Sequence, residues 1–264
     1  FLTALFLMTQ ASLALATLQI QHWQTPAGVR VYFIESHDLP ILDVSVDFNA
    51  GSSADTPEKS GRASLTHQLL DLGAGGLSED QIAKALADVG AQLGGHFDQD
   101  RAGASLRTLS SERERKQALE ILARVIQRPE FPANVLEREK VRVIAGLKES
   151  DTRPGNIADR ALMKMLYCSH PYGLRGSGEI ESVAAIQRKD LVDFYQTRYV
   201  ATGAVVAIMG DVSRAEAAAI AEALTKDLPD GKGQQGTPAA TLPVVTAPLA
   251  ETRRIAHPAT QSHI

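Results

Sequence analysis

The sequence predicts an α+β fold in which a largely antiparallel sheet carries helices packed on one side. Two patterns indicate this fold: short alternating or β-branched runs are separated by turn signals, and longer segments repeat apolar residues at helical spacing. The chain has 264 residues and is 44% hydrophobic, which is enough for a sizeable core. Its net charge of -4 shows no excess of Lys and Arg, so we do not expect nucleic acid as a partner.

Residues 1–16 form an apolar run that ends in Ala14-Leu15-Ala16, a small-residue pattern typical of a signal-peptide cleavage site. The run is shorter than a membrane span. We therefore expect cleavage after Ala16 and a periplasmic or secreted mature chain that begins at Thr17 and has no membrane span. A buried N-terminal helix is the alternative interpretation.

Three strand-like segments come next, at residues 18–23, 29–34 and 41–48. The turn signal Thr25-Pro26-Ala27-Gly28 separates the first two, which predicts an antiparallel hairpin. The third segment alternates, so every second residue points to the same face of the sheet. On that face we expect Leu42, Val44, Val46 and Phe48.

The stretch from Gly61 to Gly73 predicts a helix, because its leucines recur at helical rather than alternating spacing. We expect Gly75 and Gly76 to end this helix. The apolar side, expected to pack into the core, carries Leu65, Leu69, Leu70 and Leu72. The opposite, polar side is expected to carry Ser64, His67, Gln68 and Asp71.

The remaining segments alternate between helices and strands. Ser78 and Gln81 form a capping box that opens one helix, and Ser111 with Glu114 is expected to cap a longer one. An antiparallel strand pair is predicted at residues 91–97 and 102–109, further helices at 133–150, 157–167, 189–195 and 214–224, and an apolar strand at 204–209.

The composition changes at Pro229. Residues 230–238 are rich in glycine and glutamine, which is typical of a flexible linker. We therefore expect one domain at residues 17–228, and at 229–264 a linker followed by the start of a truncated second domain.

Several short motifs follow one another in the second half of the chain. They are His170-Pro171-Tyr172-Gly173 with Gly178 and Glu179, then Asp190-Leu191, Phe194-Tyr195 and Tyr199, and finally Gly210-Asp211. In this order, with Gly51-Ser52 ahead of the Gly61 helix, residues 18–228 resemble the N-terminal half of the M16 zinc peptidases. This family includes pitrilysin, insulinase and the mitochondrial processing peptidase. The resemblance implies a duplicated architecture whose two halves close around a peptide.

The resemblance also implies where a zinc site would lie. Family members carry an inverted His-x-x-Glu-His motif on the Gly61 helix and a further Glu ligand on a later helix. Here Ser64 and Gln68 stand at the two His positions, and His67 stands at that of the Glu base. The family's spacing leads to Ala145 for the distal ligand. Because these residues do not make a zinc site, we expect no catalytic residue, no metal and no cofactor.

Other polar residues of the chain are candidates for a site. His67, Asp71 and His96 could form a rearranged metal site, since the first two share a helix face and His96 lies on a nearby predicted strand. Exposed or hydrogen-bonded polar groups are the simpler interpretation. His37 is interpreted as a turn residue, and Cys168, the single cysteine, as a buried and unreactive thiol.

The resemblance thus predicts a non-catalytic subunit, a pseudo-peptidase, of a periplasmic M16-type zinc peptidase. We expect it to pair with a zinc-bearing subunit as a heterodimer, to form part of the chamber wall and to bind extended peptide at a strand edge. Two alternatives stay open: an active M16-type metallopeptidase with a rearranged metal site, and a structural scaffold subunit of a complex.

Overall fold

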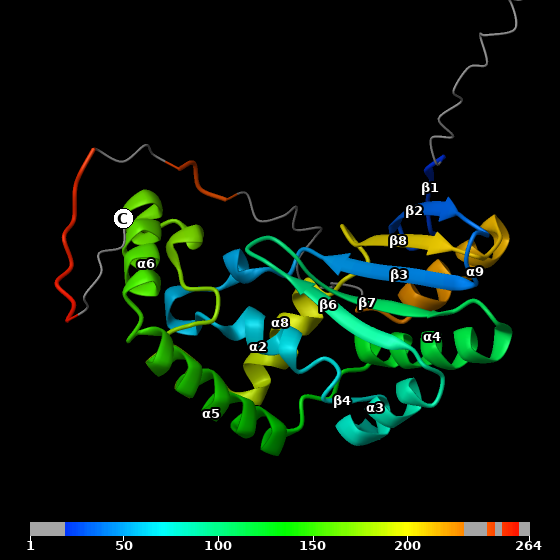
Figure 1. Ribbon diagram of the computed structural model, residues 1–264, viewed down its shortest axis with the longest axis horizontal. Helices are drawn as coiled ribbons and strands as arrows, with labels where there is room; N and C mark the ends of the chain where they lie inside the picture. The colour runs from blue at the N-terminus through cyan, green and yellow to red at the C-terminus, as the bar shows by residue number, and fades with distance from the viewer. Residues whose placement is uncertain (1–18, 230–241, 246–249, 259–264) are drawn as a thin grey trace, which may run out of the picture.

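A computed structural model of the chain describes residues 19–229, 242–245 and 250–258 (Figure 1). The strands are β1 (Gln21–Gln24), β2 (Arg30–Glu35), β3 (Ile41–Phe48), β4 (Gly73–Ala74), β5 (Leu77–Ser78), β6 (Gln92–Phe97), β7 (Ala102–Leu109) and β8 (Val205–Gly210). The α-helices are α2 (Arg62–Gln68), α3 (Glu79–Ala87), α4 (Glu112–Gln127), α5 (Ala133–Ser150), α6 (Pro154–Tyr167), α7 (Ile180–Ala185), α8 (Arg188–Arg198) and α9 (Arg214–Thr225). Short 3-10 helices are η1 (Ser52–Ala54), η2 (Pro57–Lys59) and η3 (Pro171–Gly173). No helix in the described ranges is long and apolar enough to cross a membrane.

The described residues form a six-stranded sheet in the order β1-β2-β8-β3-β7-β6, while β4 and β5 pair separately. Neighbouring strands of the large sheet are antiparallel except for β2 and β8, which are parallel. The predicted hairpin is β1–β2, in which Gln21 lies opposite Phe33. The predicted strand pair is β6–β7, in which Gln92 lies opposite Arg107. The prediction of a largely antiparallel sheet is therefore confirmed.

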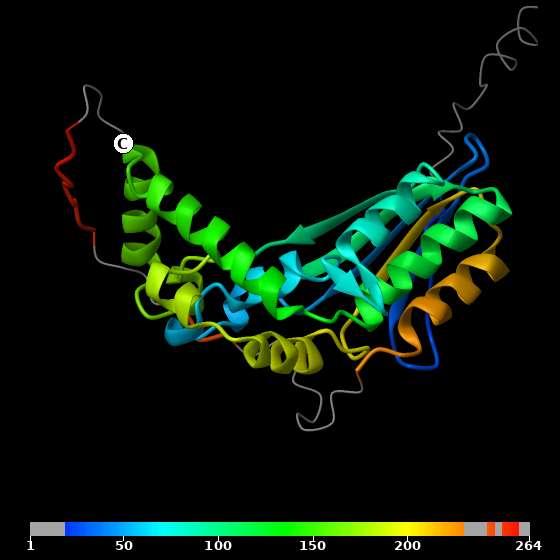
Figure 2. The ribbon, with the colours of Figure 1, turned by 90° about the horizontal axis from the view of Figure 1, so that it is seen from below.

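One face of this sheet is buried under helices, and the other is open within the described part of the chain. The alternation in β3 places its apolar side chains in the core, and β2, β7 and β8 alternate in the same way. The helices α3, α4 and α9 pack against that face (Figure 2). The open face forms a shallow hollow of about 710 Å³. The prediction of helices on one side of the sheet is confirmed.

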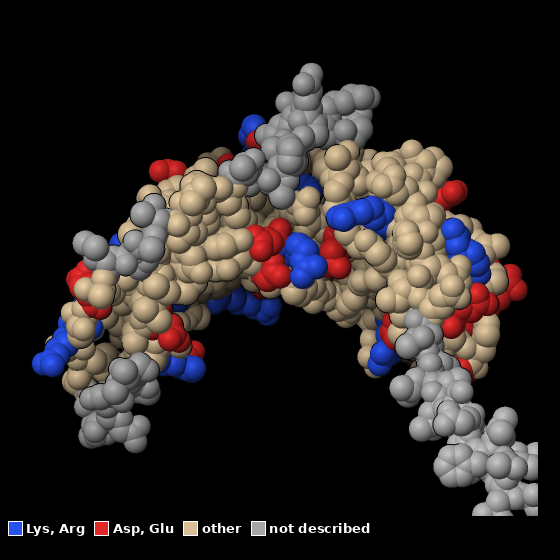
Figure 3. All heavy atoms as spheres, turned by 90° about the horizontal axis from the view of Figure 1, so that it is seen from above, with Lys and Arg blue, Asp and Glu red and all other residues tan. Residues whose placement is uncertain are grey.

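The other helices extend beyond one end of the sheet. Helix α2 packs against α8, α5 contacts α7, and α6 contacts the η3 turn. Helices α5 and α6 rise on one side of the molecule and β6 lies on the other (Figure 2). The space-filling view shows the resulting arch around an open hollow (Figure 3). Strand β6 is thus an edge of the sheet on the concave side of the molecule.

Helix α2 is shorter than the sequence predicts. It ends at Gln68, with Leu69 as its C-cap. Gly75 and Gly76, expected to end the helix, instead form the tight turn between β4 and β5, with φ values of 55° and 80°. Leu70 is nevertheless buried, because the chain turns into the core after the helix and does not need helical spacing to bury it.

Two further local predictions are wrong. Cys168 is exposed, because it is the C-cap of α6 and leaves the helix at the surface with a φ of 49°. Ser111 makes no side-chain bond to the backbone of α4; its hydroxyl instead donates to Glu114 Oε2 at 2.5 Å. The capping box of Ser78 and Gln81 is confirmed.

Candidate functional site

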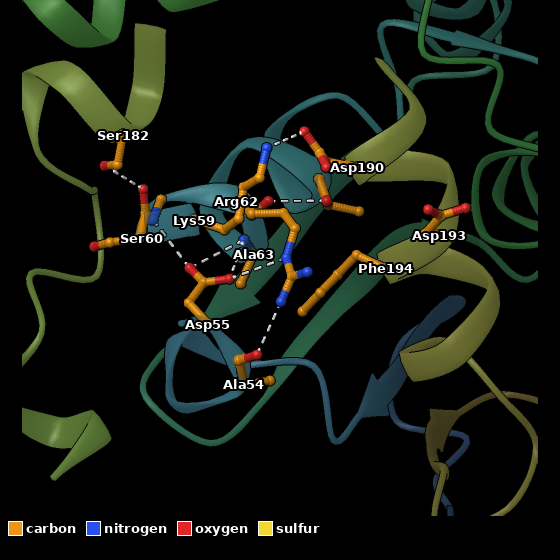
Figure 4. Close-up of polar contacts among 12 residues, drawn as sticks. Ala54, Asp55, Lys59, Ser60, Arg62, Ala63, Ser182, Asp190, Asp193 and Phe194 are labelled. Atoms are coloured by element: carbon orange, nitrogen blue, oxygen red, sulfur yellow. Dashed lines mark hydrogen bonds and ion pairs between the residues drawn. The ribbon is translucent and has the colours of Figure 1, made fainter. Parts of the chain in front are cut away.

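Helix α2 carries the residues that the sequence singled out, and Asp55 holds its N-terminus in place (Figure 4). The N–H of Gly61 donates to Asp55 Oδ2 at 3.0 Å, and the N–H of Ala63 donates to Oδ1 at 3.1 Å. The first N–H groups of a helix have no partner within the helix. The carboxylate supplies that partner and also meets the positive end of the helix dipole.

Asp55 and Arg62 form a buried ion pair. Their side chains are 2% and 20% exposed, and Arg62 Nε lies 3.4 Å from Asp55 Oδ1. The guanidinium also donates to the carbonyl of Ala54 at 3.0 Å and lies 4.8 Å from the centre of the Phe194 ring on α8. Burial raises the pKa of Asp55 to about 6, against the opposing effects of Arg62 and the N–H of Ala63. The carboxyl group is therefore ionised at neutral pH.

A second set of contacts joins the start of α2 to α7 and α8 (Figure 4). The Ser182 hydroxyl donates to the carbonyl of Ser60 at 2.8 Å, and Lys59 Nζ donates to Asp190 at 2.7 Å. Gly61 is required between these contacts, because its φ is 91° and a Cβ would lie 2.9 Å from the Ser177 carbonyl oxygen. The N-terminus of α2 is thus positioned by several elements at once.

Ser64 and Gln68, which the family resemblance places at the two His positions, are hydrogen-bonded to each other. Gln68 Nε2 donates to Ser64 Oγ at 3.0 Å. Ser64, predicted on the polar side of the helix, is buried, because η1, α5 and α8 surround the short helix. Neither side chain offers an imidazole, thiolate or carboxylate to a metal ion.

His67 fills the space between α2 and β6. Its ring stacks on Phe97, with ring centres 5.5 Å apart and an angle of 16° between the planes. A Cβ on Gly95 would lie 2.6 Å from His67 Cε1, so the ring requires a glycine there. His67 Nδ1 is buried and has no hydrogen-bond partner among the described residues. Burial lowers the pKa of His67, and the charge of His96 lowers it further.

The remaining candidates do not complete a metal site. Ala145 is exposed on α5 and has no donor atom. Asp71 lies beyond the end of α2, so the prediction that it shares a helix face with His67 is wrong. His96 Nε2 lies 2.8 Å from Asp98, at the end of β6. Across residues 19–229, 242–245 and 250–258, no group of three His, Cys, Asp or Glu side chains could hold a metal ion.

His37 has a structural role in the connection between β2 and β3. Its Nδ1 lies 2.6 Å from Asp211, which follows β8, and its Nε2 lies 3.1 Å from Glu35. Hydrogen bonds to Asp211 and Glu35 raise the pKa of His37. The imidazole thus ties the ends of two parallel strands together at the surface.

Asp55 is the residue that sequence reasoning missed. Capping signals are sought at the residue directly before a helix. Asp55 lies six positions before Gly61 and reaches it through the η2 loop. No local pattern therefore identified it.

The first prediction concerns Asp55. Asp55→Ala leaves two N–H donors and Arg62 without their acceptor, so we expect the free energy of unfolding to fall by about 3 kcal/mol. Asp55→Asn keeps one acceptor oxygen and should cost about 1 kcal/mol. The control is Asp88→Ala, which removes an exposed ion pair with Lys84 and should change little. Equal stability of Asp55→Ala and the control in urea unfolding would contradict the role given to Asp55.

The second prediction concerns His67 and pH. Its pKa is lowered in the folded chain, so the folded chain binds fewer protons than the unfolded chain. The folding stability that neutral His67 contributes is fully present above the pKa of the unfolded chain, near 6.5. It is lost as the pH falls through the lower pKa of the folded chain. We expect His67→Phe to keep the stacking on Phe97 and to weaken this loss between pH 8 and pH 5. The exposed His22→Gln on β1 is the control; identical pH profiles of all three chains would contradict the prediction.

Two family models match the chain. The model of insulinase (peptidase family M16) matches residues 30–177, and that of the peptidase M16 inactive domain matches residues 185–264. A solved structure of a peptidase M16 inactive domain from Pseudomonas fluorescens is 36% identical to this chain. It has a TM-score of 0.82, and the match covers 88% of this chain and 55% of that one.

Two relatives of lower sequence identity are also similar to this chain. Human mitochondrial-processing peptidase subunit beta is 26% identical over 190 residues, which cover 72% of this chain and 38% of that protein. The periplasmic protease PqqL from Escherichia coli is 15% identical and has the same fold, with a TM-score of 0.71 over 83% of this chain and 26% of that one. The chain therefore spans about half of the solved relative and less than half of the curated one. Since the first family model alone covers more than half of the 264 residues, the chain belongs to peptidase family M16.

Proposed function

We propose that the chain is part of a non-catalytic M16 subunit that pairs with a zinc-bearing subunit. It binds peptide and forms part of the wall of the substrate chamber. The observation that carries this proposal is the hydrogen bond between Ser64 and Gln68, the residues assigned to the zinc-binding histidines. A catalytic zinc needs three protein ligands and one open position. Serine, glutamine and the methyl group of Ala145 do not fit zinc.

A strand edge beside α2 suits an extended peptide. Strand β6 ends the sheet on the concave side of the arch (Figure 2), and no described strand pairs with its outer edge. Gly94 and Gly95 are exposed on β6, so no side chain of theirs obstructs an incoming main chain. A peptide that adds to this edge gains main-chain hydrogen bonds, and its alternate side chains point to the two faces of the sheet.

The need for a partner follows from these two features. A peptide held at β6 would lie on the strand that His67 contacts, and the residues assigned to the zinc-ligand positions hold no metal-binding group, so we propose that its cleavage requires another subunit. The human relative is itself described as a subunit of a processing peptidase, which supports a heterodimer.

We also propose where the protein resides in the cell and how its domains are arranged along the chain. A periplasmic protease shares the fold, which supports export to the periplasm. The expected signal peptide at residues 1–16 lies outside the described residues, and so does the linker at 230–238. We propose a first domain at 17–228, followed at 229–264 by a linker that leads into a second M16-like domain.

The third prediction concerns metal. The chain should retain no stoichiometric zinc after dialysis and should cleave no peptide alone, because its ligand positions hold no metal-binding group. Elemental analysis of the purified chain measures this. One zinc per chain that is lost in His67→Ala but kept in His22→Ala would contradict the proposal and favour a rearranged metal site.

The fourth prediction concerns the partner's kinetics. A wall of the substrate chamber supplies binding that is common to ground and transition states, so it lowers KM more than it raises kcat. The measurement compares peptide cleavage by the co-purifying zinc subunit, identified by its His-x-x-Glu-His motif, with and without the full-length protein. An unchanged KM, or no association at micromolar concentration, would sink the subunit proposal and leave a structural scaffold as the better interpretation.

A further inference from the structure

The tip of the β6–β7 hairpin, residues 98–101, is a closed turn held by one side chain. Asp98 Oδ1 accepts from the N–H groups of Asp100 and Arg101, both at 2.7 Å. Asp98 also donates its own N–H to the carbonyl of Arg101 at 2.9 Å. These hydrogen bonds close the turn directly at the end of the edge strand β6.

The segment that follows β3 holds this tip through its backbone. Three successive N–H groups, those of residues 51–53, donate to the carbonyls of Asp100, Asp98 and Gln99 at 3.2, 3.1 and 2.8 Å. The approach is so close that a Cβ on Gly51 would lie 2.4 Å from the carbonyl of Gln99. One side of the tip is thus fixed to the segment that connects β3 with η1.

Tyr172 holds the tip from another element. Its hydroxyl donates to Asp100 Oδ1 at 2.6 Å, across 72 positions of the sequence. That hydrogen bond raises the pKa of Tyr172 to about 12, so the donor keeps its proton at any physiological pH.

The Tyr172 ring is itself held in a defined orientation. The rings of Tyr167 and His170 contact it edge-on, at 5.6 and 4.8 Å between centres, and His170 Nδ1 accepts from the Tyr172 N–H at 3.1 Å. His170 is buried. The hydroxyl is thus aimed at the hairpin tip by packing within η3 and the end of α6.

We propose that Tyr172 is a positioning residue, which orders the edge strand β6 for peptide addition by holding Asp100 at the hairpin tip. This inference rests on the proposed function, because peptide binding at β6 is itself part of that proposal. Strand β6 is paired on one side only, with β7, and no described strand lies beyond its outer edge. Besides that pairing, it is held by His67 on Phe97 and by the contacts of the hairpin tip with residues 51–53 and with Tyr172. Strand addition is favoured when the receiving edge is already ordered, since binding then costs less conformational entropy.

Hydrogen exchange of the free chain tests the positioning role without any peptide. Tyr172→Phe keeps the ring and removes only the hydroxyl, so we expect amides of residues 92–97 to exchange about threefold to tenfold faster. Asp100→Ala should give the same pattern, and the double variant should add nothing further. Tyr32→Phe, on the open face at β2, is the matched control and should leave β6 unchanged.

Peptide affinity is the second readout. Fluorescence anisotropy with a fluorescein-labelled unstructured peptide should show a Kd about threefold to tenfold higher in Tyr172→Phe. The unfolding temperature should move by only a few degrees, which separates positioning from loss of fold. Unchanged exchange at residues 92–97 in both Tyr172→Phe and Asp100→Ala overturns the positioning role, whatever the peptide does. Faster exchange in a protein whose wild type binds no peptide overturns the proposed function and supports the ordering of β6 by Tyr172.

Discussion

The sheet has one apolar face, and this constraint organises the rest of the molecule. In β3 the side chains of Leu42, Val44 and Val46 all point to the same side, and the neighbouring strands alternate in phase with them. Because side chains alternate with a period of two, a shift of one residue would expose the whole set. Helices with an apolar stripe can bury it only against that face, so α3, α4 and α9 gather there.

Helix α2 is held in place by contacts other than those of Ser64 and Gln68, the residues that the family resemblance assigns to the two His positions. Its place is set by Asp55 at the N-terminus and by Leu65 and Leu69 in the core. None of these contacts involves the side chains of Ser64 and Gln68, which satisfy each other. The contacts that fix α2 in the fold therefore do not depend on which side chains stand at positions 64 and 68.

The concave side of the molecule carries both the open edge of β6 and the hairpin tip that Tyr172 contacts. An open strand edge has unpaired N–H and C=O groups that can bond to a strand of another chain. It is therefore both a possible binding surface and a risk of aggregation. In this protein the hairpin behind the edge is clamped to a core segment at Gly51 and to the η3 turn at Tyr172. His67 stacks behind the same strand. An ordered edge beside His67 is what the proposed peptide-binding role requires.

The sequence by itself determined the elements whose signals are local. Alternation predicted the strand at 41–48, the prolines at 129 and 132 predicted the start of the helix at 133–150, and Ser78 marked the start of another helix; these positions agree with the observed bounds. The order of the short motifs predicted the family. The pattern of short strand-like runs and turns predicted the largely antiparallel sheet. Each of these signals lies in residues that are neighbours in the chain, or in motifs whose order the chain preserves.

Only the tertiary structure decided how the candidate site is built. It ended α2 at Gln68, buried Ser64 against Gln68, and exposed Cys168. It also brought Asp55 to the start of α2 and Tyr172 to Asp100, across six and 72 positions of the sequence. Such contacts leave no periodic pattern, because they depend on where separate elements pack and not on the residues next to them.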